Sequence, residues 1–447
     1  MFRRVLVANR GEIAVRVIRA LRELEIEAVA VYSTADRDAL HVQLADRALC
    51  IGPPSPSASY LNIPSVVAAA TTTGCDAVHP GYGFLAENPA FVAACTDNDL
   101  VFIGPTAEVM ARMGDKVQAK AAMRGAGVPL VPGTEQATTL AQARELAPGI
   151  GFPILLKAAA GGGGRGMRLV ESEAELESAF ATASAEADAA FGNGSLYVEK
   201  ALVPARHVEI QVLADGHGGV LTLGERECSI QRRHQKLIEE SPSPALTPET
   251  REAMEEAAER ACRETGYTNA GTLEFLLPAR SPDGAFYFIE LNARLQVEHP
   301  VTELVTRIDI VREQLRIAAG EPLERTGRAD RDGHAIEIRI NAEDPAHGFT
   351  PSPGRIERLR APAGPGVRLD THVQAGAVIP PFYDSLIAKL VVWDEDRPRA
   401  IARALRALGE LEIDGIATTR DFAIGVLRSD EFRSGEYTTS FVDEHPA

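Results

Sequence analysis

The stretch AFYFIELNARLQVEHP, residues 285–300, decides how this 447-residue chain is interpreted. Polar residues recur at every second position, as Glu290, Asn292, Arg294, Gln296 and Glu298, and the positions between them are apolar. In an extended chain this alternation places the polar side chains on one face. A half-exposed strand shows the same pattern, but this face mixes acids, an amide and an arginine. The composition of this face favours a strand that contributes side chains to a catalytic or binding site.

A metal site is predicted where this strand meets its neighbour. The apolar run AGTLEFLL, residues 270–277, lies just upstream, and pairing of the two strands would bring Glu274 near Glu290 and Asn292. These hard oxygen ligands suit Mg²⁺ or Mn²⁺ shared with nucleotide phosphates, and they do not suit zinc. Glu298 would lie about 26 Å from Glu290 along a straight strand. The chain must therefore bend after Asn292 if both residues serve one site.

An anion pocket is expected beyond that bend. Arg294 and Gln296 suit an oxyanion, and the lone carboxylate of Glu298 suits a general base.

The run SIQRRHQK, residues 229–236, is a basic cluster in an acidic protein. Such runs are usually solvated loops. The alternative is that His234 and Lys236 line an anion pocket, together with His207 and Glu209 from the neighbouring run RHVEIQV.

The glycine run in PILLKAAAGGGGRGMRLV, residues 153–170, satisfies G-x-G-x-x-G but is followed by a strand-like segment. A dinucleotide-binding fingerprint must open a helix, so that interpretation fails, and no P-loop motif is present. The remaining options are a plain surface loop or a glycine hairpin whose N–H groups close over phosphates. Lys157 at the end of the preceding strand favours phosphate binding.

Length and composition limit the number of domains and the class of protein. A chain of this length holds about three domains, and its 45% hydrophobic and 24% charged residues are ordinary for a globular protein. A net charge of −17 argues against partners such as nucleic acid or an anionic membrane. Five scattered cysteines form neither a disulfide framework nor a zinc motif, and no signal peptide or membrane-spanning run is visible. We expect a cytoplasmic protein.

Strand and helix patterns alternate at the N-terminus, as in a βαβ parallel sheet, with strands expected at 4–9 and 27–33 and a helix at 12–24. Two alternating runs around Asp215 and Gly216 predict a hairpin. Helices are predicted at 176–191 and 248–266. A separate C-terminal unit is expected from about residue 333, with strands at HAIEIRIN, RIERLRA and LIAKLVVW and a helix at 398–411.

Nine segments, in order along nearly the whole chain, resemble the biotin carboxylases, which are ATP-grasp enzymes. They are ANRGEIAVR, HPGYGFLAEN, MGDK, KAAAGGGGRGMR, RHVEIQV, QRRHQK, ELNARLQVEHPVTE, RINAED and PPFYDSLIAKL. The resemblance implies an α/β protein in three parts: a βαβ N-terminal domain (1–113), an ATP-grasp domain (114–332) with a mobile lid at about 131–203, and an α+β C-terminal domain (333–447). One departure is Ala160, which stands where many relatives extend the glycine run.

The resemblance also implies site roles. The residues expected to contact nucleotide are Lys116, Lys157, Gly163, Gly164, Glu199, Lys200, Leu202, His207, Gln231 and His234. Those expected to hold bicarbonate or biotin are Lys236, Arg294, Gln296, Val297, Arg339 and Tyr82, with Lys236, Arg294, Glu298 and Arg339 taken as catalytic. The implied metal ligands are Glu274, Glu290 and Asn292, for Mg²⁺ or Mn²⁺.

The implied reaction uses ATP and bicarbonate to carboxylate biotin on a carrier protein, through carboxyphosphate. HPGYGFLAEN could equally be a plain βα turn, and two other functions stay open: another ATP-grasp ligase with an amine acceptor, and a catalytically silent nucleotide-binding subunit. No biotinylation motif or carboxyltransferase region is visible in the sequence. We therefore expect a free-standing subunit of acetyl-CoA carboxylase or a related acyl-CoA carboxylase. Its expected partners are a biotin carboxyl carrier protein, carboxyltransferase subunits and a second copy of the chain.

Overall fold

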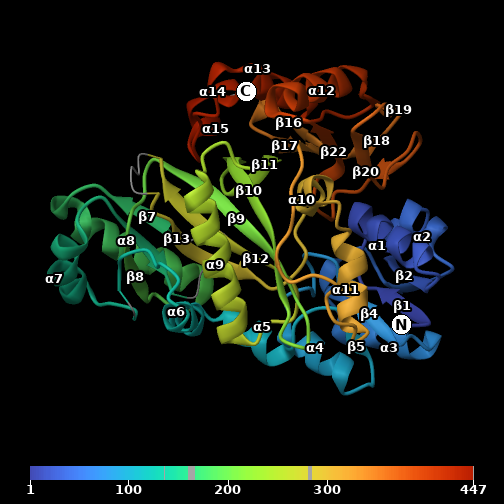
Figure 1. The fold of residues 1–447 in the computed structure, drawn as a ribbon, viewed down its shortest axis with the longest axis horizontal. Helices are drawn as coiled ribbons and strands as arrows, with labels where there is room; N and C mark the ends of the chain where they lie inside the picture. The colour runs from blue at the N-terminus through green and yellow to red at the C-terminus, as the bar shows by residue number, and fades with distance from the viewer. Residues whose placement is uncertain (135, 160–166, 280–283, 446–447) are drawn as a thin grey trace.

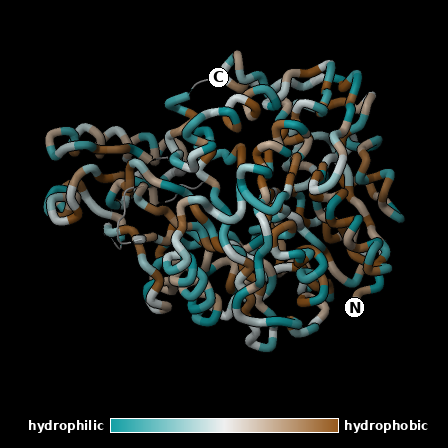
Figure 2. Tube along the Cα trace, turned by 45° about the horizontal axis from the view of Figure 1, so that its top comes forward, coloured by the Kyte–Doolittle hydropathy of each residue, from teal (hydrophilic) through white to brown (hydrophobic). Residues whose placement is uncertain are grey.

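The computed structural model describes residues 1–134, 136–159, 167–279 and 284–445. Four groups of elements follow one another from the N-terminus to the C-terminus (Figure 1). Hydrophobic residues gather inside each group, and hydrophilic residues occupy most of the outer turns (Figure 2). No helix in these ranges is long and apolar enough to cross a membrane.

The N-terminal group is a five-stranded parallel sheet in the order β3-β2-β1-β4-β5, which confirms the predicted βαβ pattern. Its inner strands are buried apolar runs, which is typical of a parallel sheet covered on both faces. The strands are β1 (Arg4–Val7), β2 (Glu27–Ser33), β3 (Arg47–Gly52), β4 (Ala77–His79) and β5 (Val101–Phe102). The helices are α1 (Gly11–Glu23), η1 (Thr34–Asp36), α2 (Leu40–Leu44), η2 (Pro56–Ala58), α3 (Ile63–Thr73), α4 (Pro89–Thr96), α5 (Ala107–Gly114) and α6 (Lys116–Gly125).

A small antiparallel sheet in the order β7-β6-β8 forms the next group, at the left of Figure 1. Its strands are β6 (Ile154–Ala158), β7 (Met167–Val170) and β8 (Leu196–Lys200), and its helices are α7 (Leu140–Ile150) and α8 (Glu173–Phe191). A capping box between Thr139 and Gln142 begins α7, and left-handed Gly192 ends α8. The glycine run that joins β6 to β7, including Gly163 and Gly164, lies outside the described residues.

A nine-stranded sheet occupies the centre, in the order β13-β12-β9-β10-β11-β15-β22-β20, with β14 beside β10. The strands of its first half are β9 (Ala205–Ala214), β10 (Val220–Arg232), β11 (Gln235–Ser241), β12 (Asn269–Pro278), β13 (Tyr287–Asn292) and β14 (Gly327–Arg328). The helices of this part of the chain are α9 (Pro248–Thr265), α10 (His299–Thr306) and α11 (Ile310–Ala318). The expected hairpin is present as β9 and β10, but its predicted polar–apolar alternation does not match burial. Nearly every residue of both strands is buried, because helices cover the sheet and the polar side chains pair with one another inside.

The C-terminal group continues the same sheet with β15 (His334–Asn341), β20 (Val367–Thr371) and β22 (Leu386–Asp394). Helices α12 (Arg397–Glu410), α13 (Arg420–Arg428), α14 (Asp430–Ser434) and α15 (Phe441–Glu444) cover it, at the top of Figure 1. The short elements are β16 (Glu343–Asp344), η3 (Pro345–His347), β17 (Thr350–Pro351), β18 (Gly354–Arg355), β19 (Arg358–Arg360), β21 (Val378–Ile379) and β23 (Glu412–Asp414). The prediction of one strand at RIERLRA was wrong, because its two ends pair with different partners, β21 and β23.

Candidate active site

A largely buried lysine stands at the centre of the site. Lys236 Nζ donates to carboxylate oxygens of Glu209 at 2.6 Å, Glu274 at 3.0 Å and Glu298 at 2.5 Å. The tight turn between β10 and β11 places Lys236 here, with Arg233 and His234 both at positive φ. Arg233 and His234 are solvent-exposed, as in a solvated loop, whereas Lys236 lies among the buried carboxylates. The anion-binding role of His234 and Lys236 stays a prediction.

The Glu298 carboxylate contacts two cationic side chains. One oxygen contacts Lys236, and the other accepts a 3.0 Å hydrogen bond from Arg339 Nη2. Arg339 Nε also donates to Glu239 at 2.6 Å. Burial alone would raise the pKa of the Glu298 carboxyl, but the charges of Lys236, Arg339 and Arg226 outweigh burial and hold that pKa below its ordinary value. Glu298 is thus an ionised, buried carboxylate with two cations beside it.

The predicted bend is confirmed. Strand β13 ends at Asn292, and Glu298 is the residue immediately before α10, whose first turn contains Pro300. Proline is favoured at the start of a helix, since its fixed φ suits the first turn and no N–H is needed there. The turn carries Glu298 back over the sheet, to β11 and β15, where Lys236 and Arg339 lie.

The predicted metal ligands meet across two strands. Glu274 and Glu290 are direct cross-strand partners in the β12–β13 pair, as the sequence predicted. The pKa of the Glu290 carboxyl is raised by desolvation and by the negative charges of Glu274 and Glu87. A divalent cation would relieve this repulsion, and the donors are the hard oxygens that Mg²⁺ prefers, so the residues fit such an ion. His207, Glu209 and Glu274 also bring ligand atoms within 4.8 Å of one another.

Arg294 is held by a residue that sequence reasoning missed. Glu87 accepts a hydrogen bond from Arg294 Nε at 2.8 Å and another from the backbone N–H of Ala293 at 3.2 Å. Arg294 Nη2 also donates to Asn292 Oδ1 at 3.0 Å. Glu87 lies at the end of HPGYGFLAEN, so this segment is more than a plain βα turn.

Arg226 is a second residue that sequence reasoning missed. It is fully buried and donates to Glu209 at 2.5 Å, to Gln211 at 2.7 Å and to Gln296 Oε1 at 2.9 Å. Gln296 in turn donates from Nε2 to Glu274 at 2.8 Å. Arg226 therefore fixes the amide orientation of Gln296. In the sequence it stands between Glu225 and Glu227, and this local pattern does not point to Gln296.

Lys389 links the site to the N-terminal sheet. Its fully buried Nζ donates to the carbonyl of Val297 at 2.8 Å and lies 3.2 Å from Glu12. The Tyr82 hydroxyl donates to the same Glu12 carboxylate. Tyr82 is thereby connected, through Glu12 and Lys389, to the backbone beside Glu298.

A second cluster of charge lies between α6 and the small sheet. Lys157 Nζ contacts Glu199 at 2.5 Å, and Lys120 pairs with the same carboxylate. Burial would raise the pKa of Glu199, but the charges of Lys157 and Lys120 lower it instead. The pKa of Lys116 is lowered by burial and by the charge of Lys157. Positive charge therefore exceeds negative charge in this group.

The remaining predicted nucleotide contacts lie around these two clusters. Lys200 Nζ donates to the carbonyls of Gly151 and Phe152, both at 2.9 Å, and Leu202 follows two residues later. Gln231 is buried as the cross-strand partner of Lys236. His207 Nε2 lies 3.0 Å from Glu274, and this carboxylate raises the His207 pKa against the opposing effect of burial.

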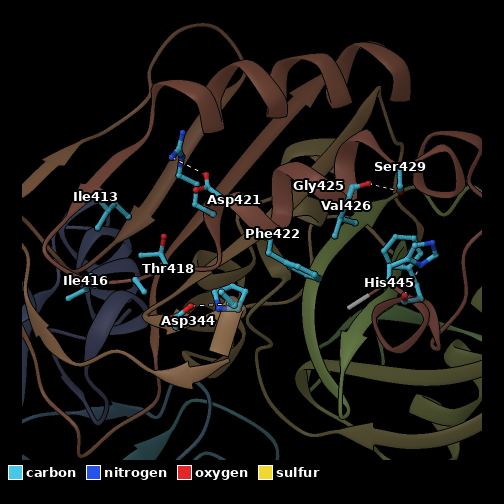
Figure 3. A pocket seen from close by; sticks show the side chains of 15 residues that line it. Asp344, Ile413, Ile416, Thr418, Asp421, Phe422, Gly425, Val426, Ser429 and His445 are labelled. Atoms are coloured by element: carbon cyan, nitrogen blue, oxygen red, sulfur yellow. Dashed lines mark hydrogen bonds and ion pairs between the residues drawn. The ribbon is translucent and has the colours of Figure 1, made fainter. Parts of the chain in front are cut away.

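A pocket of about 690 Å³ lies elsewhere, in the C-terminal group (Figure 3). It is lined by α13, β16 and the segment around residues 413–418, and Phe422 and His445 project into it from different elements. None of its lining residues belongs to the predicted site.

Family models match the chain in three consecutive segments. The description "Biotin carboxylase, N-terminal domain" matches residues 1–110, "Carbamoyl-phosphate synthase L chain, ATP binding domain" matches 115–326, and "Biotin carboxylase C-terminal domain" matches 337–444.

Curated relatives match over the full length. The biotin carboxylase of Nostoc sp. (strain PCC 7120) is 55% identical over 445 residues, which cover 99% of each chain. Biotin carboxylase 1 of Bacillus subtilis (strain 168) is 51% identical over 447 residues, which cover 100% of this chain and 99% of the relative.

Solved structures agree with these matches. The complex of Campylobacter jejuni biotin carboxylase with a β,γ-ATP ligand superimposes with a TM-score of 0.95 at 48% identity, covering 100% of this chain and 99% of the other. The biotin carboxylase domain dimer of Hydrogenobacter thermophilus 2-oxoglutarate carboxylase, in complex with MgADP, ADP and bicarbonate, gives 0.93 at 48% identity, with 100% and 98% covered. The chain belongs to the biotin carboxylase family.

Proposed function

We propose that this chain uses ATP to activate bicarbonate and transfers the carboxyl group to biotin on a separate carrier protein. The observation that carries the proposal is the arrangement of Glu298 between Lys236 and Arg339. A buried carboxylate between two cations has both a proton acceptor and the positive charge that an oxyanion needs. Relatives that bind a β,γ-ATP ligand, MgADP and bicarbonate support the same reaction.

Bicarbonate activation is assigned to the residues around the bend. Arg294, Gln296 and the Val297 backbone hold the anion together with Lys236, and Glu298 removes its proton. The oxyanion then attacks the γ-phosphorus of ATP, which forms carboxyphosphate and releases ADP. Lys236 is suited to this step because it already balances three carboxylates and can exchange one of them for substrate.

Nucleotide binding is assigned to the small sheet and its surroundings. Lys116 and Lys157 contact phosphate oxygens, Gly163 and Gly164 close over them, and Glu199, Lys200, Leu202, His207, Gln231 and His234 contact the rest of the nucleotide. Glu274, Glu290 and Asn292 would hold Mg²⁺ or Mn²⁺, which supplies positive charge to the transferring phosphoryl group.

Biotin is assigned to the side of the cluster that faces Arg339 and Tyr82. Carboxyphosphate releases CO₂ beside biotin, and the phosphate takes the proton from the biotin N1 atom. The Arg339 guanidinium stabilises the negative charge that develops on the ureido oxygen.

The proposed parts are 1–113, 114–332 with a lid at about 131–203, and 333–447. A homodimer, a biotinylated carrier protein and a carboxyltransferase complete the proposed assembly, and the dimeric Hydrogenobacter relative supports the first of these. The acyl-CoA that finally accepts the carboxyl group is chosen by the carboxyltransferase. A cytoplasmic location remains a prediction.

The direct test measures ATP cleavage with bicarbonate and free biotin added separately and together. The proposal predicts slow, bicarbonate-dependent cleavage that biotin stimulates. Cleavage that ignores both additions would contradict it.

A further inference from the structure

The segment HPGYGFLAEN contains a residue whose backbone needs support. Phe84 adopts φ +41°, a left-handed conformation that is rare for a bulky side chain and persists only where surrounding contacts hold it. Two residues earlier, the carbonyl of Tyr82 accepts a 2.7 Å hydrogen bond from Asn9 Nδ2. Tyr82 is therefore fixed by Asn9 on one side and by the packing of Phe84 on the other.

The Phe84 ring belongs to a group of three, which we call the aromatic junction: Tyr60, Phe84 and Tyr383. Phe84 stacks on Tyr60 with centroids 5.0 Å apart, and the Tyr383 ring meets both others edge-on, at 5.6 Å from Tyr60 and 6.4 Å from Phe84. Tyr60 is 1% exposed. The junction thus joins two segments that are distant in the sequence, around residues 84 and 383, and both pack on the buried ring of Tyr60.

Buried polar contacts fix the Tyr383 ring. Its hydroxyl donates to the carbonyl of Pro54 at 2.8 Å and lies 2.5 Å from Ser33 Oγ. The Arg10 guanidinium lies 4.2 Å from the ring centroid and is itself held by two hydrogen bonds to Asp36, at 2.7 and 2.8 Å.

The Tyr60 hydroxyl completes these contacts by donating to Asp36 at 2.6 Å. Every group that orients Tyr383 in these contacts belongs to the N-terminal group of elements, although Tyr383 itself lies in the C-terminal part of the chain.

Tyr383 is also tied to the strand of Arg339. Two residues later, the carbonyl of Ser385 accepts from the Ala342 N–H at 2.8 Å, and Ser385 Oγ donates to Glu343 at 2.5 Å. The next residue begins β22, where Lys389 pairs with Arg339 across the sheet. One side of the aromatic junction therefore leads to Tyr82, and the other leads to Arg339.

We propose that the aromatic junction sets the separation between the Tyr82 and Arg339 sides of the biotin pocket, and that Phe84 and Tyr383 are positioning residues for biotin. The inference rests on the proposed function, because it assigns biotin to that pocket. The residues assigned to ATP lie on other elements, so ATP binding does not depend on the junction. The segment of Phe84 also carries Glu87, which holds Arg294, so a smaller effect on bicarbonate is expected beside the effect on biotin.

The test is a double-mutant cycle on Phe84→Leu and Tyr383→Leu, with free biotin as the probe. Each single variant is expected to raise the KM for biotin about tenfold or more, since small displacements of positioning groups have effects of that size. The KM for ATP is expected to stay at the wild-type level, and the slow bicarbonate-dependent ATP cleavage without biotin is expected to change much less than the KM for biotin. Because both rings act through one contact, the double variant is expected to be no worse than the poorer single variant.

Two further variants separate positioning from folding. Tyr383→Phe keeps the ring over Arg10 and loses only the hydroxyl contacts, so its KM for biotin is expected to rise severalfold at most. Phe91→Leu is the matched control, because Phe91 of α4 makes an edge-on contact with Phe102 of β5 at 5.9 Å, in the same N-terminal group but outside the junction. It is expected to lower Tm and leave the KM for biotin unchanged.

Three results would overturn the inference. Single variants that raise the KM values for ATP, bicarbonate and biotin alike would show a general structural role. Effects of Phe84→Leu and Tyr383→Leu that multiply in the double variant would show that the two rings act separately. A wild-type enzyme whose ATP cleavage ignores bicarbonate and biotin would remove the proposed function and the inference with it.

Discussion

The two halves of the site balance charge in opposite ways. Around Glu298, the cations Lys236, Arg226 and Arg339 are fully or largely buried and each contacts at least one carboxylate. Where α6 meets the small sheet, Lys120 of α6 and Lys157 of β6 share Glu199, and 24% of each lysine side chain remains exposed. We call the first group the acid–base cluster and the second the lysine cluster.

This difference in charge balance indicates how each half of the site would bind its substrate. The lysine cluster has surplus positive charge that is open to solvent, so it is suited to bind a polyanion such as a nucleoside triphosphate. In the acid–base cluster, an anion can bind only by taking over a cation that a carboxylate now holds. Under the proposed function, bicarbonate would enter by exchange, and the same event would free Glu298 to act as base.

The largest expected effect is in the acid–base cluster. Glu298→Gln keeps the shape of the side chain but removes its ability to accept a proton, so bicarbonate-dependent ATP cleavage is expected to fall by about 10²–10⁴-fold. The KM for ATP should remain near the wild-type value. Steady-state kinetics with ATP and bicarbonate varied in turn provide the measurement.

A matched control is Glu240→Gln. Glu240 is a buried glutamate of the same strand as Lys236, and it pairs with His334 and Arg397 outside the cluster. This variant is expected to lower Tm and keep the bicarbonate dependence. Equal losses of activity in the two variants would mean that Glu298 serves structure and not proton transfer.

The next largest effect is expected in the lysine cluster. Lys157→Met removes one charge from the surplus, and the KM for ATP is expected to rise about tenfold, as for loss of one or two charge-assisted hydrogen bonds. The KM for bicarbonate should not change. Arg168→Met is the control, since Arg168 lies in the adjacent strand β7 and pairs with Glu186 at the surface. A rise in the KM for bicarbonate with Lys157→Met would break the division into two halves.

The smallest expected effect is on pH dependence. The pKa of Glu298 is held below its ordinary value, so its base form is fully populated between about pH 6 and pH 8 and cannot produce an acid limb there. Burial raises the pKa of Glu239, which holds Arg339, to about 7. As the pH falls through that value Glu239 takes up a proton and its hold on Arg339 weakens.

We therefore expect a severalfold change at most in the biotin-stimulated rate near neutral pH, which Glu239→Gln should remove. Bicarbonate-dependent cleavage without biotin should be nearly flat over the same range. A steep acid limb in that reaction, unchanged by Glu239→Gln, would place the titrating group elsewhere.

Local patterns in the sequence predicted much of the frame. The alternation in residues 285–300 and the adjacent apolar run were enough to pair Glu274 with Glu290, because antiparallel neighbours joined by a short turn fix their own register. The bend before Glu298 followed from the strand's length together with the assumption that Glu290 and Glu298 serve one site. The parallel N-terminal sheet followed from its alternating strand and helix patterns.

The partners of those residues could not be predicted in the same way. Glu239 and Lys389 lie in strands whose pairing spans long stretches of chain. Arg226 lies in the local β9–β10 hairpin but contacts Gln296 far along the chain, so no local spacing relates any of the three to Glu298. Lys389 carries the clearest signal, a lone charge within the apolar run LIAKLVVW, whereas Arg226 and Glu239 stand beside other charged residues. That pattern marks a buried ion pair, but it does not say with which residue.

The most direct test of the account is transfer of carbon from labelled bicarbonate to free biotin. The wild-type enzyme with ATP and Mg²⁺ is expected to form acid-labile labelled carboxybiotin, with one ADP released for each biotin carboxylated, and Glu298→Gln is expected to form none. ATP cleavage by the wild-type enzyme without label in biotin, or equal labelling by Glu298→Gln, would contradict the account.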